Sequence, residues 1–471
     1  MIHRYQKIYL LILLVIVSTG CKKLVDVNPP ITSINEANVY SNDATAISVL
    51  TGIYSNVIGS NYPGGINSLS FYPSLSADEL TLYGGIMGTM YLYYTNVLTN
   101  TNGVDFWNDI YPEIYVTNSA VAGLNASSAL TPQIKQQLLG EAKFMRAFFY
   151  FYLVNLYGNV PLVTSTNYTI NNLLPRAPAA TVYQQIISDL KDAQSSLSTN
   201  YLDGTLLNTT AAKVRPTSWA ATSLLARCYL YTNDWADAES QATAVIGSSQ
   251  FNLSPLTGSN SVFLMNSAEA IWQLQPTKVG ENTPDAQIFI IPPTGPSSSY
   301  PVYLSNSLLE SFENGDQRRL NWVDSVVVTG TTYYFPYKYQ AYLIGAPVTE
   351  YEMVLRLGEQ YLIRAEARAE QGNLTGAASD LNAIRQRAGL NATTAITQLQ
   401  LLTAIQHERQ VELFTEWGHR WLDLKRTGLV DSVMANVEPQ KGGNWSNDWA
   451  LYPLPLTDLQ ADPKLTQNPG Y

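Results

Sequence analysis

The chain is long, acidic and rich in tyrosine. Its 471 residues carry 27 Lys and Arg against 37 Asp and Glu, which gives a formal net charge of −10 at pH 7. Nucleic-acid binding depends on basic side chains that neutralise phosphates, so this composition argues against nucleic acid as a partner. The chain also contains 31 Tyr and 9 Trp, and a ring with a polar edge suits a half-exposed surface. We therefore expect a surface that binds a flat, polar ligand.

Residues 1–20 have the pattern of a secretory signal peptide. Basic Arg4 and Lys7 precede an unbroken apolar run from Ile8 to Val17, which is shorter than the about 20 residues of a membrane-spanning helix. Small residues and then Cys21 follow. This arrangement resembles the bacterial lipobox, so we predict that Cys21 is lipidated and becomes the new N-terminus. The alternative is ordinary secretion with an incidental Cys21.

Cleavage after residue 20 would leave a lipidated tether at residues 21–35 and a single domain at residues 36–471. It removes two basic residues and no acidic residue, so the formal charge changes from −10 to −12. Cys228 is the only other cysteine, so no disulfide is expected within an acylated chain. Attachment to the membrane would then depend on the lipid and not on charge.

Helical spacing of apolar residues alternates along the chain with long irregular segments. We predict helices at residues 43–58, 106–124, 136–157, 184–197, 217–246 with a break at Asn233 and Asp234, 353–372, 374–389 and 397–417. Insertions near residues 59–103 and 251–350 are rich in Gly, Ser, Tyr and, in the second case, Pro. The second insertion also contains the β-like run SVVVTGTTYYF. Long loops of this kind are often functional.

Two of the helical pairs share a pattern of small residues. Ala226 and Ala238 are twelve residues apart, as are Ala365 and Ala377, and small residues at this spacing let antiparallel helices approach closely. This is the logic of tetratricopeptide repeats. We predict a mostly α fold, with a tetratricopeptide-like scaffold of helical pairs interrupted by long irregular loop insertions.

The two insertions hold the candidate ligand-binding residues. Aromatic rings can stack on the apolar faces of sugars, while Asn, Asp and Gln bond the hydroxyls, and such mixtures are usual in ligand sites. The alternative for each tyrosine is packing against its own loop. The candidates are Tyr83, Tyr91 and Tyr93 in the first insertion, and Tyr300 and Tyr303 in the second.

A dense group of charges lies between His407 and Gly428. Paired carboxylates can act as acid and base in glycoside hydrolysis, but carboxylates beside Arg stay ionised, which suits ion pairing instead. We therefore interpret the group as a structural Arg–carboxylate network that fixes the last helices to the scaffold. Its members are Glu408, Arg409, Glu412, Glu416, Arg420, Asp423 and Arg426.

No pattern for catalysis, a metal or a cofactor was found. Only His407 and His419 follow the signal peptide, twelve residues apart, and no cysteine cluster exists. The sequence has no Gly-x-Ser-x-Gly motif and no phosphate-binding loop. We therefore expect a non-enzymatic protein without a metal or cofactor.

Several stretches together resemble the SusD/RagB family of Bacteroidetes outer-membrane lipoproteins. The most specific is HERQVELFTEWGHRWLDLKRTG at residues 407–428. GEAKFMRAFFYFYLVNLYGNVPLV, VLRLGEQYLIRAEARAEQGN, LNAIRQRAGL and LPLTDLQADPKLTQNPGY agree in the family's order. The resemblance extends from the lipobox to Tyr471.

This resemblance implies a lipid-anchored protein of the outer membrane that faces the cell exterior. It implies capture of a nutrient, most often an oligosaccharide or polysaccharide, and delivery to a SusC-like TonB-dependent transporter. It also places glycan-binding residues in a loop after the Asp78–Glu79 pair and in a mid-chain insertion. Three alternatives stay open: the same fold binding peptide or another non-glycan nutrient, a helical scaffold for protein partners, and a glycosidase.

Overall fold

The computed structural model describes residues 39–59, 66–103 and 105–471. The predicted signal peptide, the Cys21 lipidation site and the tether up to residue 35 lie outside the described residues. The described part is mostly helical with four small two-stranded sheets, which confirms the predicted fold class. Within it, no helix combines the length and apolar character needed to cross a bilayer.

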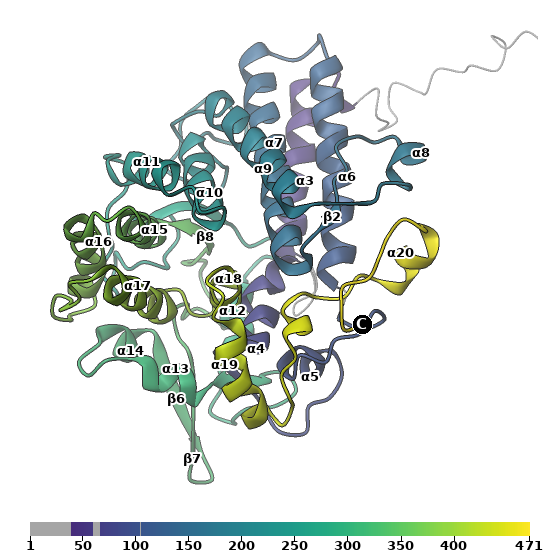
Figure 1. Ribbon diagram of the computed structural model, residues 1–471. Coiled ribbons are helices and arrows are strands. Elements are labelled where there is room, and N and C mark those ends of the chain that lie inside the picture. The colour runs from purple at the N-terminus through teal and green to yellow at the C-terminus, as the bar shows by residue number, and fades with distance from the viewer. Residues whose placement is uncertain (1–38, 60–65, 104) are drawn as a thin grey trace, which may run out of the picture.

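Four long helices form one side of the molecule (Figure 1). They are α3 (Asp43–Gly59), α6 (Asp105–Ala126), α7 (Pro132–Tyr157) and α9 (Ala179–Ser196). The central helix α7 is buried over most of its length and packs against α3, α6 and α9. An arm between α7 and α9 carries β2 (Val160–Pro161), α8 (Tyr168–Asn171) and β3 (Arg176–Ala177).

The predicted helical pairs continue this packing. They are α10 (Ser218–Tyr231), α11 (Trp235–Ile246), α15 (Leu357–Glu370), α16 (Leu374–Arg387) and α17 (Gln398–Glu412). Helix α9 packs against α10, α10 against α11, α11 against α15, and α15 against both α16 and α17. Ala226, Ala238, Ala365 and Ala377 are all fully buried. The insertions therefore interrupt the sequence of helical pairs but not their packing in space.

Local chemistry explains the ends of these helices. The break between α10 and α11 falls at Asn233, whose φ of 59° is left-handed, and the Asp234 side chain then caps α11. The Asn373 side chain caps α16. Thr397 and Gln400 form a reciprocal capping box at the start of α17, an arrangement that satisfies two otherwise unpaired backbone donors.

Neither insertion is wholly irregular. The first contains η2 (Ile66–Ser70), α4 (Tyr72–Ser76), β1 (Leu80–Leu82) and α5 (Thr89–Tyr94). The second contains β4 (Ala270–Leu274), α12 (Pro284–Phe289), β5 (Val302–Leu304), α13 (Asn306–Ser311), α14 (Gln317–Asn321), β6 (Val323–Val328) and β7 (Thr331–Pro336). The predicted helix at residues 353–372 begins later, because Glu352–Arg356 forms strand β8, which pairs with β4. The short helices and the strand of the first insertion show that the expectation of loop structure throughout residues 59–103 was wrong.

The last part of the chain returns across the molecule. It contains α18 (His419–Arg426), α19 (Val430–Val437), η3 (Glu438–Lys441), η4 (Asn447–Ala450) and α20 (Leu456–Ala461). Helix α18 packs against α4 and α19. This return path brings the 407–428 stretch against the first insertion.

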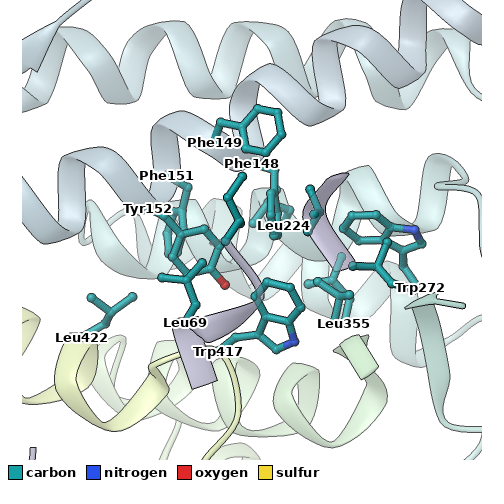
Figure 2. Close-up of a cluster of buried hydrophobic side chains, with 14 of the residues drawn as sticks. Leu69, Phe148, Phe149, Phe151, Tyr152, Leu224, Trp272, Leu355, Trp417 and Leu422 are labelled. Carbon is teal, nitrogen blue, oxygen red and sulfur yellow. The ribbon is translucent and has the colours of Figure 1, made fainter. Parts of the chain in front are cut away.

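The core is aromatic where the helices meet the insertions. Figure 2 shows Tyr152 of α7 beside Trp417, with Trp272 of β4 at the other side of the cluster. The Phe148 ring lies edge-on to Trp272 and to Trp417, with ring centroids 5.5 Å and 5.7 Å apart. Because edge-to-face pairs have preferred geometry, this cluster helps to fix the second insertion and the 407–428 stretch against α7.

Candidate functional site

Strand pairing brings the two aromatic insertions together. Strand β1 of the first insertion pairs antiparallel with β5 of the second, with Leu80 opposite Leu304 and Thr81 opposite Tyr303. The backbone N–H of Tyr83 then donates to the carbonyl of Pro301 over 2.7 Å. Tyr83 and Tyr300, which are far apart in sequence, are therefore carried by neighbouring ends of one small sheet.

A hairpin supplies a further ring. Strands β6 and β7 pair antiparallel around a turn at Thr329 and Gly330, and the hairpin projects from one end of the molecule (Figure 1). The Tyr333 ring of β7 lies edge-on to Tyr303, with ring centroids 5.2 Å apart, and edge-on to Tyr83, with ring centroids 6.0 Å apart. We call Tyr83, Tyr300, Tyr303 and Tyr333 the aromatic surface.

The rings of the aromatic surface are half-buried. Tyr303 and Tyr333 also pack against the hydrophobic core. Burial, with a smaller contribution from Tyr333, raises the pKa of Tyr303. A rigid ring with one open side is suited to stacking because little conformational freedom is lost on binding. Tyr333 was not among the predicted site residues, although the β-like run SVVVTGTTYYF contains its hairpin.

The prediction that Tyr93 contacts ligand is wrong. Tyr93 lies in α5 and is fully buried. Its ring stacks on Tyr72, with centroids 4.3 Å apart, and its hydroxyl donates to the Gly103 carbonyl over 3.0 Å. Burial holds its pKa well above the usual value. The helical turn of α5 directs Tyr93 inward, whereas Tyr91 stays half-buried and packs against the edge of the core.

The 407–428 charges join a buried network around Arg356. The Glu412 carboxylate accepts from Arg356 and Arg318 over 2.6 Å and 2.9 Å, and also from Arg387. Burial opposes ionisation of Glu412, but Arg387, Arg356 and Arg318 outweigh it and hold its pKa well below the usual range. Glu416 accepts from Arg356 over 2.7 Å, and Glu408 lies 2.7 Å from Arg318.

A second part of the network joins α17 to α18 and α15. Arg409 and Arg426 each donate to Asp423 over 2.7 Å, and Arg426 also donates to Glu366. Asp423 is buried, and Arg409 and Arg426 outweigh that burial to hold its pKa below the usual value. Asp423 therefore stays in its paired, ionised form, as do Glu412 and Glu416, whose pKa values are also lowered by neighbouring cations, and this state does not suit a general acid.

Arg420 connects the network to the aromatic insertions. Its guanidinium donates twice to the Asp78 carboxylate, over 2.7 Å and 2.8 Å. Asp78 and Glu79 lie just before β1 and are buried, and the Glu79 carbonyl accepts from Ser305 N–H over 2.9 Å. The buried Asp78–Glu79 pair thus stabilises the start of β1 and the end of β5, and it is not exposed to a ligand. Burial raises the pKa of Glu79 to about 7.

A cavity of about 1050 Å³ lies elsewhere. It is bounded by one face of α3, by the 202–215 loop and by residues 274–277 after β4. None of the predicted tyrosines lines it. Across the described residues, no group of three or more His, Cys, Asp and Glu is arranged to hold a metal ion.

Two family models match the chain. Residues 323–471 match the SusD family, and residues 35–230 match a family described as starch-binding and associating with the outer membrane. The chain belongs to the SusD-like family. The resemblance drawn from the sequence motifs is therefore confirmed. As a member of this family the chain is not an enzyme, which agrees with the expectation from its sequence.

Similar proteins match either most of this chain or one part of it. SusD-like protein P25 of Formosa agariphila is 25% identical, over 78% of this chain and 79% of its own length. The starch-binding protein SusD of Bacteroides thetaiotaomicron is 31% identical over 25% of this chain and 21% of its own length. A solved laminarin-binding SusD-like protein superposes with a TM-score of 0.73 at 25% identity, covering 92% of this chain and all of that chain.

Proposed function

We propose that this protein captures a glycan on the aromatic surface and delivers it to a SusC-like TonB-dependent transporter. The pairing of β1 with β5 carries the proposal, because it brings Tyr83 and Tyr300 to neighbouring ends of one sheet, with the Tyr333 ring against Tyr83 and Tyr303. The starch-binding and laminarin-binding relatives support a glycan as the ligand. The proposed delivery to the transporter rests on the family resemblance alone.

We further propose that lipid on Cys21 anchors the protein to the outer membrane, with the described domain facing the cell exterior. The family description associates related chains with the outer membrane. Radiolabelled palmitate incorporated into the full chain, and lost in Cys21→Ala, would support the anchor. Incorporation that persists in Cys21→Ala would contradict it.

Affinity electrophoresis tests the capture step. The chain from residue 22, which retains every described residue, is run in native gels containing each of a set of polysaccharides. We expect at least one polysaccharide to retard the protein, and Tyr83→Ala/Tyr300→Ala to remove the retardation. Tyr115→Ala/Tyr168→Ala is the matched control, because both tyrosines are exposed and lie on α6 and α8. Retardation that survives in the Tyr83/Tyr300 variant would place the glycan elsewhere.

A second candidate function is supported by the cavity beside α3. Its volume of about 1050 Å³ and its mainly apolar lining, including Ile47, Ile58 and Val214, suit an extended peptide better than a sugar ring. Its lining contains Tyr54, but that side chain is buried and its hydroxyl donates to Glu141 over 2.7 Å. Binding of peptide and not of polysaccharide would favour this alternative.

A further inference from the structure

We infer that the glycan captured by the aromatic surface is electrically neutral, without uronic acid or sulfate groups. The inference rests on the proposed function and narrows its substrate class. It depends on the distribution of charged side chains around Tyr83, Tyr300, Tyr303 and Tyr333.

The segments that carry three of these rings contain no charged residue. Residues 80–103 contain neither Asp, Glu, Lys nor Arg, and the same is true of residues 286–309. Charged residues make up 14% of the chain, so two uncharged segments of this length that meet at one site mark a distinct surface. Their exposed polar groups are hydroxyls and amides, among them Thr294, Ser298 and Ser299.

Arg319 of α14, the cation that contacts the hairpin, lies on the face away from this surface. Successive side chains of a strand point to opposite faces, so Tyr334 lies on the other face from Tyr333. The guanidinium of Arg319 lies over the Tyr334 ring, 4.5 Å from its centroid. On the Tyr333 face of the hairpin, the charged residue is Asp324, which is exposed and acidic.

The cations beneath β1 are already paired. Arg420 donates to Asp78, Lys338 is bound to Glu416, and Lys441 donates to the carbonyls of Leu75 and Ser76 over 2.7 Å and 3.1 Å. Lys338 and Lys441 are buried, and Arg420 has only 12% of its side chain exposed. None of the three extends toward the ligand side.

An anionic glycan would therefore lose hydration without gaining a cationic partner. Carboxylates and sulfates are recognised through charge-assisted hydrogen bonds, most often from Arg. Here the anion would instead meet uncharged polar groups and Asp324, on a protein whose formal net charge is −12 without residues 1–20, and this charge is repulsive. Hydroxyl groups of a neutral sugar require only the donors and acceptors that are present.

The test compares glycans that differ only in charge. The chain from residue 22 is screened against neutral polysaccharides (starch, laminarin, galactomannan, arabinoxylan) and anionic ones (polygalacturonate, alginate, sulfated galactan). A neutral glycan that binds is then converted to its carboxymethyl derivative and to the methyl ester of that derivative, which has nearly the same size and no charge. We expect the ester to bind like the parent and the carboxylate to bind about tenfold more weakly at low salt.

Each outcome has a separate meaning. Affinity for the neutral parent should change little between about 0.05 M and about 0.5 M NaCl, whereas the difference between ester and carboxylate should shrink as salt screens the repulsion. Binding of an anionic glycan that is lost in Tyr83→Ala/Tyr300→Ala would overturn the inference and leave glycan capture intact. A carboxylate that binds as tightly as its ester would also overturn it. Binding of no polysaccharide would contradict glycan capture, and it would also contradict the inference, which rests on glycan capture.

Discussion

The ring of Tyr83 lies edge-on to the ring of Tyr333, with their centroids 6.0 Å apart. The two residues come from different insertions, and strand β5 lies between them, because it pairs with β1 and contacts β7. Three segments that are distant in sequence thus meet as one layer of tyrosines. The position of each ring therefore depends on the pairing of β1 with β5 and on the contact of β5 with β7.

Tyr333→Ala should weaken glycan binding. Removing this ring takes away a stacking face and the edge that orients Tyr83 and Tyr303, and a single stacked aromatic contributes on the order of 1 kcal/mol. We expect affinity to fall by about fivefold to tenfold, measured by isothermal titration against the polysaccharide that retards the protein.

Tyr334→Ala is the matched control for Tyr333→Ala. It removes the neighbouring ring on the opposite face of the hairpin, where Arg319 lies. Equal losses in the two variants would show that the hairpin acts through its fold and not through the Tyr333 ring.

Substitutions of Tyr93 should separate packing from binding. Tyr93→Phe loses only the hydrogen bond to Gly103, so we expect the free energy of unfolding to fall by about 1 kcal/mol with glycan affinity unchanged. Tyr93→Ala leaves a cavity among Tyr72, Phe106 and Tyr452 and should cost about 3–5 kcal/mol. Denaturant titration measures both. Lost affinity in a stable Tyr93→Phe protein would contradict the buried role.

Arg420→Ala should lower stability strongly. It leaves the buried Asp78 carboxylate without its cation, and breaking a buried pair costs about 3–5 kcal/mol. Lys143→Ala is the control, because the Lys143–Asp192 pair lies at the surface, with 26% and 53% of the two side chains exposed, and should contribute less than about 1 kcal/mol. Thermal unfolding followed by circular dichroism measures both. An Arg420→Ala protein with native stability but no glycan binding would contradict the structural role of the network.

Glu79 should make stability depend on pH. Its pKa is raised by burial from 4.5 to about 7 in the folded protein, so the folded state favours the protonated carboxyl. This stabilisation is fully present below about pH 4.5 and is lost as the pH rises through about 7. Relative to Glu79→Gln, the free energy of unfolding of the native chain should fall by on the order of 3 kcal/mol over that interval.

Denaturant titrations at several pH values provide the measurement for Glu79. Glu310→Gln serves as the control, because Glu310 is an exposed carboxylate on α13. A constant difference between native chain and Glu79→Gln from pH 4.5 to pH 7 would contradict the raised pKa.

The scaffold was predictable because its signals are local. Apolar spacing identified α3, α6 and α7, and the small residues at Ala226 and Ala238 indicated a close helical pair. Helix α15 was placed too early because β8 forms only by pairing with the distant strand β4. Local sequence carries no information on such a partner, and tertiary pairing overrides helical spacing there.

The candidate site was predictable only in part, for a related reason. The aromatic composition of the insertions indicated Tyr83, Tyr300 and Tyr303. Whether a tyrosine points outward depends on its place in a helix or strand, and the short helix α5 turned Tyr93 into the core. The sequence did not indicate Tyr333 as a site residue. Its ring reaches Tyr303 only because β7 contacts β5, and these strands are separated in the sequence.

Hydrogen–deuterium exchange, with and without oligosaccharide from the retarding polysaccharide, tests the central claim most directly. If the aromatic surface binds the glycan, backbone amides in residues 80–91 and 297–304 and in the β6–β7 hairpin should exchange more slowly in the complex. Residues 43–58 and 202–215, which line the separate cavity, should be unchanged. Protection confined to the cavity segments would contradict the account and place the ligand beside α3.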